Sequence, residues 1–155
     1  MPRAPVLRLV RLALRRVLPL CACLLALWAG RAEAGFLIVR NGKNATAKLS
    51  KDSIKSVFSG RTKTWPSGET IILVIGSEDS PAMQWLASEI FAVSAKTFLA
   101  KLKQDVFKGD VPRPMAANDD TGTIKHVLSR AGAVGVVSDA AAKSLPADVA
   151  VIAVH

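Results

Sequence analysis

The chain has 155 residues, half of them hydrophobic, and its 21 Lys and Arg residues against 12 Asp and Glu residues give a formal net charge of +9. Residues 1–34 hold six of the basic residues, one acidic residue and both cysteines, so residues 35–155 carry a net charge of only +4 and no thiol. This weak basicity does not favour a nucleic-acid-binding protein. The lack of thiols excludes disulfides, cysteine metal sites and cysteine nucleophiles from residues 35–155.

Residues 1–34 have the pattern of a cleavable secretory signal peptide. Five arginines and no acidic residue precede residue 17, residues 17–29 are uncharged, and Ala32 and Ala34 are small residues of the kind that a signal peptidase recognises. We therefore predict cleavage before Gly35 and export to the periplasm. A retained anchor is disfavoured because this apolar run spans only about 20 Å of a hydrocarbon core of roughly 30 Å. A lipid on Cys23 is a further alternative, which the apolar residues after Cys23 disfavour.

The first half of the remaining chain predicts two strands and a helix. Residues 36–39 form a branched apolar run that ends at an Asn-Gly turn, which is typical of a buried strand followed by a polar loop. Ser50 is placed to cap a helix, Leu49 to pack on Ile54 as a hydrophobic staple, and Gly60 to end the helix in a left-handed conformation. A turn at 65–68 (Trp-Pro-Ser-Gly) then precedes an apolar strand at 70–75.

The second half predicts three longer helices, a short one and two further strands. Ser80 and Pro81 open a helix whose apolar residues recur at helical spacing up to Phe91. Further helices are expected from Ser94 to Gly109 and from residues 118–121 to Gly132, followed by strands at 133–137 and 149–154 and a short helix at 139–145 between them. Strands that alternate with helices predict one α/β domain over residues 35–155, with a mainly parallel or mixed sheet flanked by helices.

Five motifs of residues 35–155 occur in an order that resembles the phosphate ABC transporter substrate-binding protein family. They are the helix from Leu49 that ends in Val57-Phe58-Ser59-Gly60, Lys63 with the turn at 65–68, Phe107-Lys108-Gly109, the prolines 112 and 114, and the strand 131–135 (Ala-Gly-Ala-Val-Gly). The resemblance implies the fold of one lobe of a type 2 periplasmic binding protein. Since family members have two lobes, it also implies that half of the ligand cleft is missing.

The resemblance places the ligand site at the start of the helix that follows the second apolar strand. Family members hold phosphate there with an Arg-x-x-x-Ser-Gly-Thr run, which aligns with residues 76–82; Gly76 replaces the arginine and only Ser80 is retained. Glu78 and Asp79 add negative charge to this segment. Backbone N–H groups at a helix start can still hold an anion. The expected ligand-binding residues are therefore Ser77, Ser80, Ala82 and Met83, and the alternative is that the serines only cap the helix.

No residue pattern predicts a catalytic centre, a metal site or a cofactor. Asn118, Asp119 and Asp120 lack the further spaced carboxylates of a calcium loop and are better explained as helix caps. His126 lies inside a predicted helix and His155 is the last residue, so the two histidines lack metal-ligand spacing. A binding protein is therefore favoured over an enzyme.

Two functions remain open from the sequence. The first is a periplasmic solute-binding protein that holds phosphate or another small oxyanion weakly, in connection with a membrane transporter component. The second is an accessory module that keeps the lobe fold and binds another periplasmic protein. In either case a homodimer or a partner protein would supply the second surface that tight ligand binding requires.

Overall fold

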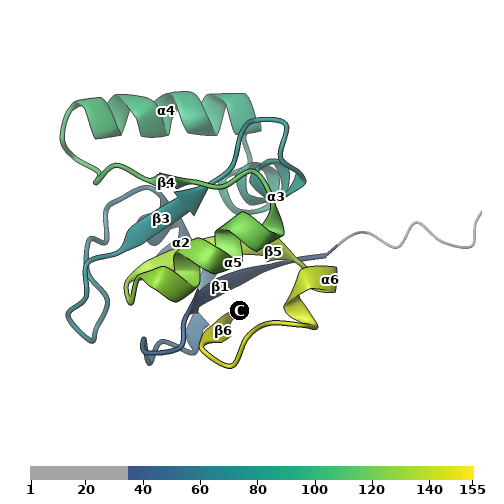
Figure 1. Cartoon of the computed structure of the whole chain (residues 1–155). Coiled ribbons are helices and arrows are strands. Elements are labelled where there is room, and N and C mark those ends of the chain that lie inside the picture. The colour runs from purple at the N-terminus through teal and green to yellow at the C-terminus, as the bar shows by residue number, and fades with distance from the viewer. Residues whose placement is uncertain (1–34) are drawn as a thin grey trace, which may run out of the picture. The chain divides into compact units, whose positions relative to one another are not determined.

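The computed structural model describes residues 35–155, and the predicted signal peptide at 1–34 lies outside the described residues. One six-stranded sheet runs through residues 35–155 with helices on both faces (Figure 1). Its strands follow the order β2-β6-β1-β5-β3-β4. Their bounds are β1 (Phe36–Asn41), β2 (Lys48–Leu49), β3 (Ile72–Ile75), β4 (Met115–Ala116), β5 (Ala133–Ser138) and β6 (Val149–Val154).

The sheet is mixed, and β1 is the strand that makes it so. Strand β1 pairs antiparallel with both β5 and β6, whereas β3 pairs parallel with β4 and with β5, and β2 pairs parallel with β6. The predicted α/β class with a mixed sheet flanked by helices is confirmed. The carboxyl ends of β3, β4 and β5 consequently meet at the same edge of the sheet, and β1 begins there.

Helices cover the two faces of the sheet and divide the core into two layers. One face carries α2 (Lys51–Phe58), α3 (Pro81–Trp85), the π-helix η1 (Leu86–Phe91) and α4 (Ala95–Phe107), and the other carries α5 (Asp120–Ser129) and α6 (Asp139–Ala142). Successive side chains of β1 point to opposite faces of the sheet, so Ile38 packs in the first layer and Val39 in the second. No helix among residues 35–155 is long and apolar enough to cross a membrane.

The helix after Ser80 differs from the continuous α-helix that the sequence predicts. Helix α3 ends after five residues and continues as the π-helix η1, which Ala92 ends in a left-handed conformation at φ 55°. Leu86 and Ile90 remain buried in this wider turn, so their spacing does not distinguish the two helix types. The two-residue strands β2 and β4 were also not expected, because two residues are too few to show a period.

Trp65, in the turn before β3, belongs to the core. Its side chain is 3% exposed, and its indole Nε1 donates a hydrogen bond to the carbonyl of Gly132 at 3.0 Å. This bond ties the turn before β3 to the turn before β5. It therefore fixes the relative position of the two strands whose carboxyl ends form the candidate site.

Candidate functional site

A pocket of about 390 Å³ lies where β3, β4 and β5 end and α3, α5 and α6 begin. The chain runs from β3 to β4, which is the neighbour of β3 at the edge of the sheet. Helix α5 then connects β4 to β5, which is the neighbour of β3 on its other side. Ligands of open α/β sheets bind at the carboxyl ends of strands where the connections diverge in this way. The lining residues are Phe36, Val74, Gly76, Ser80, Pro81, Ala82, Met83, Ala117, Asn118, Asp119, Asp120, Thr123, Val136 and Ser138.

The start of α3 contributes unused hydrogen-bond donors to the pocket. Ser80 occupies the N-cap position, but its side chain makes no capping hydrogen bond. The first N–H groups of a helix have no partner within the helix, so those of Ala82 and Met83 are left without the side-chain acceptor that a capping serine would supply. Of the predicted binding residues, the structure thus brings Ser80, Ala82 and Met83 to one pocket.

Ser77 lies apart from that group. It does not line the 390 Å³ pocket but a larger groove on the other side of the segment after β3, together with Glu78. Its carbonyl oxygen accepts a hydrogen bond from the N–H of Ser80 at 3.1 Å. Ser77 therefore shapes the turn that leads into α3.

Gly76 occupies the position at which the resemblance would place an arginine. A Cβ atom at Gly76 would lie 2.9 Å from Ser80 Oγ and 3.2 Å from the carbonyl oxygen of Ala117. These distances are shorter than ordinary contacts, so a side chain at Gly76 would require the Ser80 side chain and the Ala117 carbonyl to shift.

Two aspartates occupy the other helix starts that border the pocket. Asp119 caps α5 by accepting a hydrogen bond from the N–H of Gly122 at 2.6 Å. Asp120 accepts bonds from the N–H and the hydroxyl of Ser138, the N-cap of α6, at 3.2 and 2.6 Å. Because carboxylates interact favourably with the positive end of a helix, Asp119 and Asp120 stabilise the start of α5, and Asp120 also holds the N-cap residue of α6.

The acidic residues of the pocket are not the ones that the sequence suggested. Glu78 and Asp79 were expected beside the ligand, yet neither lines the 390 Å³ pocket. Asp119 and Asp120 were predicted as helix caps, which is confirmed for Asp119 at α5, but their place in the pocket was missed. They follow β4, a strand of two residues that shows no period, so the sequence carries no signal that places them at this edge of the sheet.

Metal ligands are not grouped in the part of the chain that the structure describes. Residues 35–155 contain no cluster of three or more His, Cys, Asp or Glu side chains arranged to hold a metal ion. His126 lies in the last turn of α5 and His155 follows β6, as the sequence indicates. The geometry of the pocket offers hydroxyl and N–H donors beside two carboxylates.

Comparison with known proteins supports the fold. No protein-family model matches the chain, and no curated protein matches it. Among solved structures it resembles an ABC-type phosphate transport receptor from Vibrio cholerae, with 19% identity, a TM-score of 0.60, and coverage of 78% of this chain and 46% of the receptor. A phosphate-binding protein from Stenotrophomonas maltophilia shows 20% identity, a TM-score of 0.61 and coverage of 78% and 39%. PfluDING, a high-affinity periplasmic phosphate-binding protein, shows 25% identity, a TM-score of 0.56 and coverage of 77% and 37%.

The resemblance predicted from the motifs is thus confirmed at the level of the fold. The described chain has the lobe fold of phosphate ABC transporter substrate-binding proteins, which are binding proteins rather than enzymes. It spans less than half the length of each of these solved structures. What the whole of those proteins binds therefore does not transfer to this chain by similarity alone.

Proposed function

We propose that residues 35–155 form an exported solute-binding domain that holds a small oxyanion weakly in the pocket at the carboxyl ends of β3, β4 and β5. The observation that carries the proposal is the set of unused donors at the start of α3, namely the Ser80 hydroxyl and the N–H groups of Ala82 and Met83. Solved structures with this lobe fold are described as phosphate-binding or phosphate transport proteins, which supports an oxyanion as the ligand class.

Two features of the pocket predict low affinity. Pro81, Asn118 and Asp119 line the pocket and are exposed, so a bound ion stays in contact with water and its hydrogen bonds remain screened. Asp119 and Asp120 also repel an anion that enters. We expect a dissociation constant no tighter than about 0.1 mM for a monomer, which corresponds to roughly 5.5 kcal/mol.

Calorimetric titration of the purified protein with phosphate and with sulfate, at low ionic strength, tests this function. Heat that saturates in the millimolar to 0.1 mM range, and that decreases as salt is added, supports it. The matched control is titration with chloride at the same ionic strength, which corrects for non-specific screening. The absence of a binding heat with every oxyanion would refute the proposed site.

Export to the periplasm forms part of the proposal and rests on the residues before Gly35. The solved structure of PfluDING is described as periplasmic, which agrees with that location for the fold. Intact-mass measurement of protein released from the periplasm should give a chain that begins at Gly35. A mass that retains residues 1–34, or a lipid adduct on Cys23, would contradict the export prediction without affecting the pocket.

A second function is favoured by the same aspartates. Because Asp119 caps α5, Asp120 accepts hydrogen bonds from the N-cap residue of α6, and Gly76 supplies no guanidinium, the fold can persist without a ligand. We infer an accessory role in which the domain binds another protein. The absence of a heat of oxyanion binding, together with specific binding of another protein, would favour this function over solute binding.

A further inference from the structure

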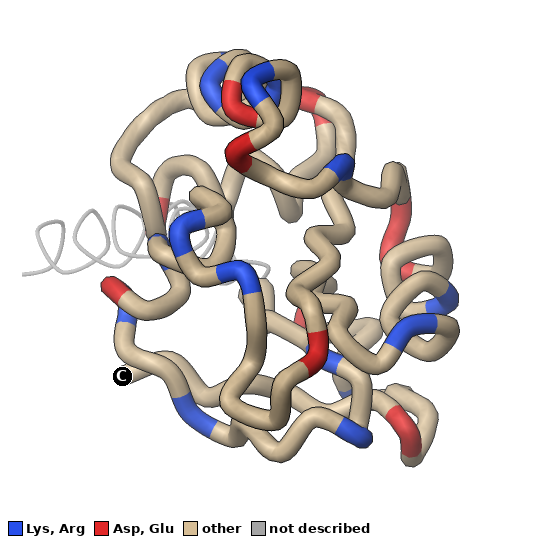
Figure 2. Tube along the Cα trace, turned by 90° about the vertical axis from the view of Figure 1, so that its left-hand side faces the viewer, with Lys and Arg blue, Asp and Glu red and all other residues tan. Residues whose placement is uncertain are grey.

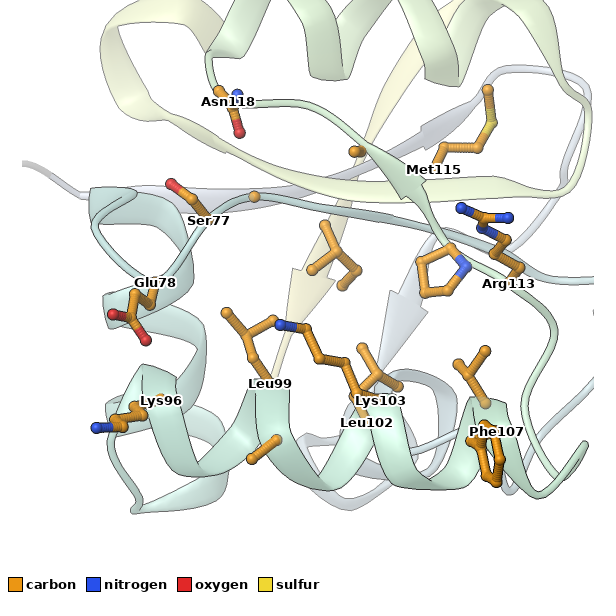
Figure 3. A pocket seen from close by; sticks show the side chains of 16 residues that line it. Ser77, Glu78, Lys96, Leu99, Leu102, Lys103, Phe107, Arg113, Met115 and Asn118 are labelled. Atoms are coloured by element: carbon orange, nitrogen blue, oxygen red, sulfur yellow. The ribbon is translucent and has the colours of Figure 1, made fainter.

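A groove of about 900 Å³ runs between α4 and the β3–β4 edge of the sheet, and it shares only Gly76 and Asn118 with the lining of the proposed oxyanion pocket (Figure 3). Leu99 and Leu102 point from α4 into the groove and Ile75 lines it on the sheet side, whereas the side chain of Met115 points away from α4 and packs on the α5 face. The lining is predominantly apolar. Apolar grooves of this size on the surface of a soluble domain mark sites of association.

Strand β4 leaves one backbone edge of the sheet unpaired within the described chain. It is the last strand of the sheet and pairs only with β3. The N–H of Ala117 donates to the carbonyl of Ile75 at 3.0 Å. Because the polar groups of successive residues in a strand point to opposite sides, the N–H and carbonyl of Ala116 point away from β3. Ala116 lines the groove, so this donor and acceptor are available to a further strand there.

The far end of the groove carries an aromatic side chain that the fold does not bury. Phe107, the last residue of α4, lines the groove and is 93% exposed, while Val106 beside it is half-buried. A phenylalanine in water forgoes the stabilisation that burial of its ring would supply. Its place at the edge of an apolar groove is that of an anchor for a bound side chain.

The charges on the rim of the groove select the chemistry of the occupant. Lys96, Lys103 and Arg113 line it, and Glu78 is the one carboxylate among the lining residues. Within residues 35–155 the one ion pair joins Lys101 to Asp105, so none of the three rim cations forms an ion pair with a carboxylate of the described chain. Figure 2 shows basic segments on α4, which is seen nearly end-on at the top. The rim is therefore complementary to carboxylates.

We propose that this groove binds an extended segment of another protein, in which apolar side chains alternate with aspartate or glutamate, as an added strand beside β4. The backbone of the segment pairs with Ala116, its apolar side chains lie against Leu99 and Phe107, and its carboxylates reach Lys103 and Arg113. Strand addition explains why an unpaired edge and an apolar groove occur together, since main-chain hydrogen bonds supply affinity and alternate side chains supply specificity.

Fluorescence anisotropy with a labelled peptide that alternates valine with aspartate or glutamate tests the proposal on the purified protein. Ala116→Pro removes the outward donor and leaves the β3–β4 hydrogen bonds in place, while K103E and R113E reverse the rim charge. Each change should raise the dissociation constant by about five-fold or more. The matched control is K125E, which makes the same change of charge on α5, away from the groove, and should leave binding unchanged. Far-ultraviolet circular dichroism verifies that each variant is folded.

Three results would overturn the proposal. The first is no binding of the acidic peptide up to about 1 mM, or equal binding of a peptide with lysine at the acidic positions. The second is a dissociation constant that responds equally to K125E and K103E. The third is a dimer in light scattering that Phe107→Ser converts to a monomer, because the groove would then hold a second copy of the chain. Oxyanion titration is independent of all three, so failure here leaves the proposed function standing.

Discussion

Replacing Asp120 with asparagine should lower stability and raise oxyanion affinity at the same time. The Asp120 carboxylate accepts two hydrogen bonds from Ser138, and the asparagine amide can accept at only one of its two terminal atoms. The charge near the starts of α5 and α6 is lost as well. We expect D120N to reduce the free energy of unfolding by about 1–2 kcal/mol.

The affinity should change in the opposite direction because the pocket is small. A sphere of 390 Å³ has a radius of about 4.5 Å, so an anion at the centre of the pocket lies about that far from the residues that line it, and Asp120 is one of them. Two unit charges at about 4 Å repel each other by about 1 kcal/mol in water and more in a protein environment. Removal of this repulsion should lower the dissociation constant for phosphate by at least about five-fold.

Urea unfolding and calorimetry on the same samples measure the two effects. D148N is the matched control, since Asp148 is exposed, does not line the pocket and loses the same charge. The increase in affinity should shrink as salt is added. If D120N unfolds more easily but binds phosphate no better than D148N does, the carboxylate does not oppose the anion and the explanation of weak binding is wrong.

Three further substitutions separate structure from binding. Ser80→Ala should leave the free energy of unfolding within about 0.5 kcal/mol, because no capping bond is lost, and should weaken oxyanion binding about five-fold in calorimetry. Asn41→Ala removes two donors to the carbonyls that end α5, at 2.9 and 3.1 Å, and should cost about 2–3 kcal/mol in urea unfolding. Trp65→Phe loses the bond to Gly132 and should cost about 1–2 kcal/mol, whereas an unchanged midpoint would refute its bridging role.

Most of the fold could be predicted because its elements carry local signals. Ser50, Ser94 and Asp119 each cap a helix through the side chain, as their residue types indicate. The strand at 149–154 was predicted with the observed bounds, since a continuous apolar run needs no knowledge of its neighbours. The direction of a strand within the sheet is not encoded locally. Whether β1 lies parallel or antiparallel to β5 depends on the end of the sheet at which the chain enters β1, and no residue of β1 determines that by itself.

The candidate site was predicted only where one segment forms it. The residues 80–83 belong to a single helix start, so sequence reasoning placed three of the four predicted binding residues in the pocket. Asp120 and Ser138 meet there across eighteen positions of sequence, and their bond follows from the parallel arrangement of β4 and β5 with β3. The close approach of the Ala117 carbonyl to Gly76 is likewise a tertiary contact. Composition and residue spacing do not predict such a contact.

Titration of phosphate into a strictly monomeric sample, with the mass verified by light scattering at the concentration used, tests the central claim most directly. The account predicts a dissociation constant no tighter than about 0.1 mM, because one hydroxyl and two backbone N–H groups attract the anion while two carboxylates repel it. Micromolar binding by the monomer would contradict it, and would mean that residues 35–155 form a complete and buried oxyanion pocket.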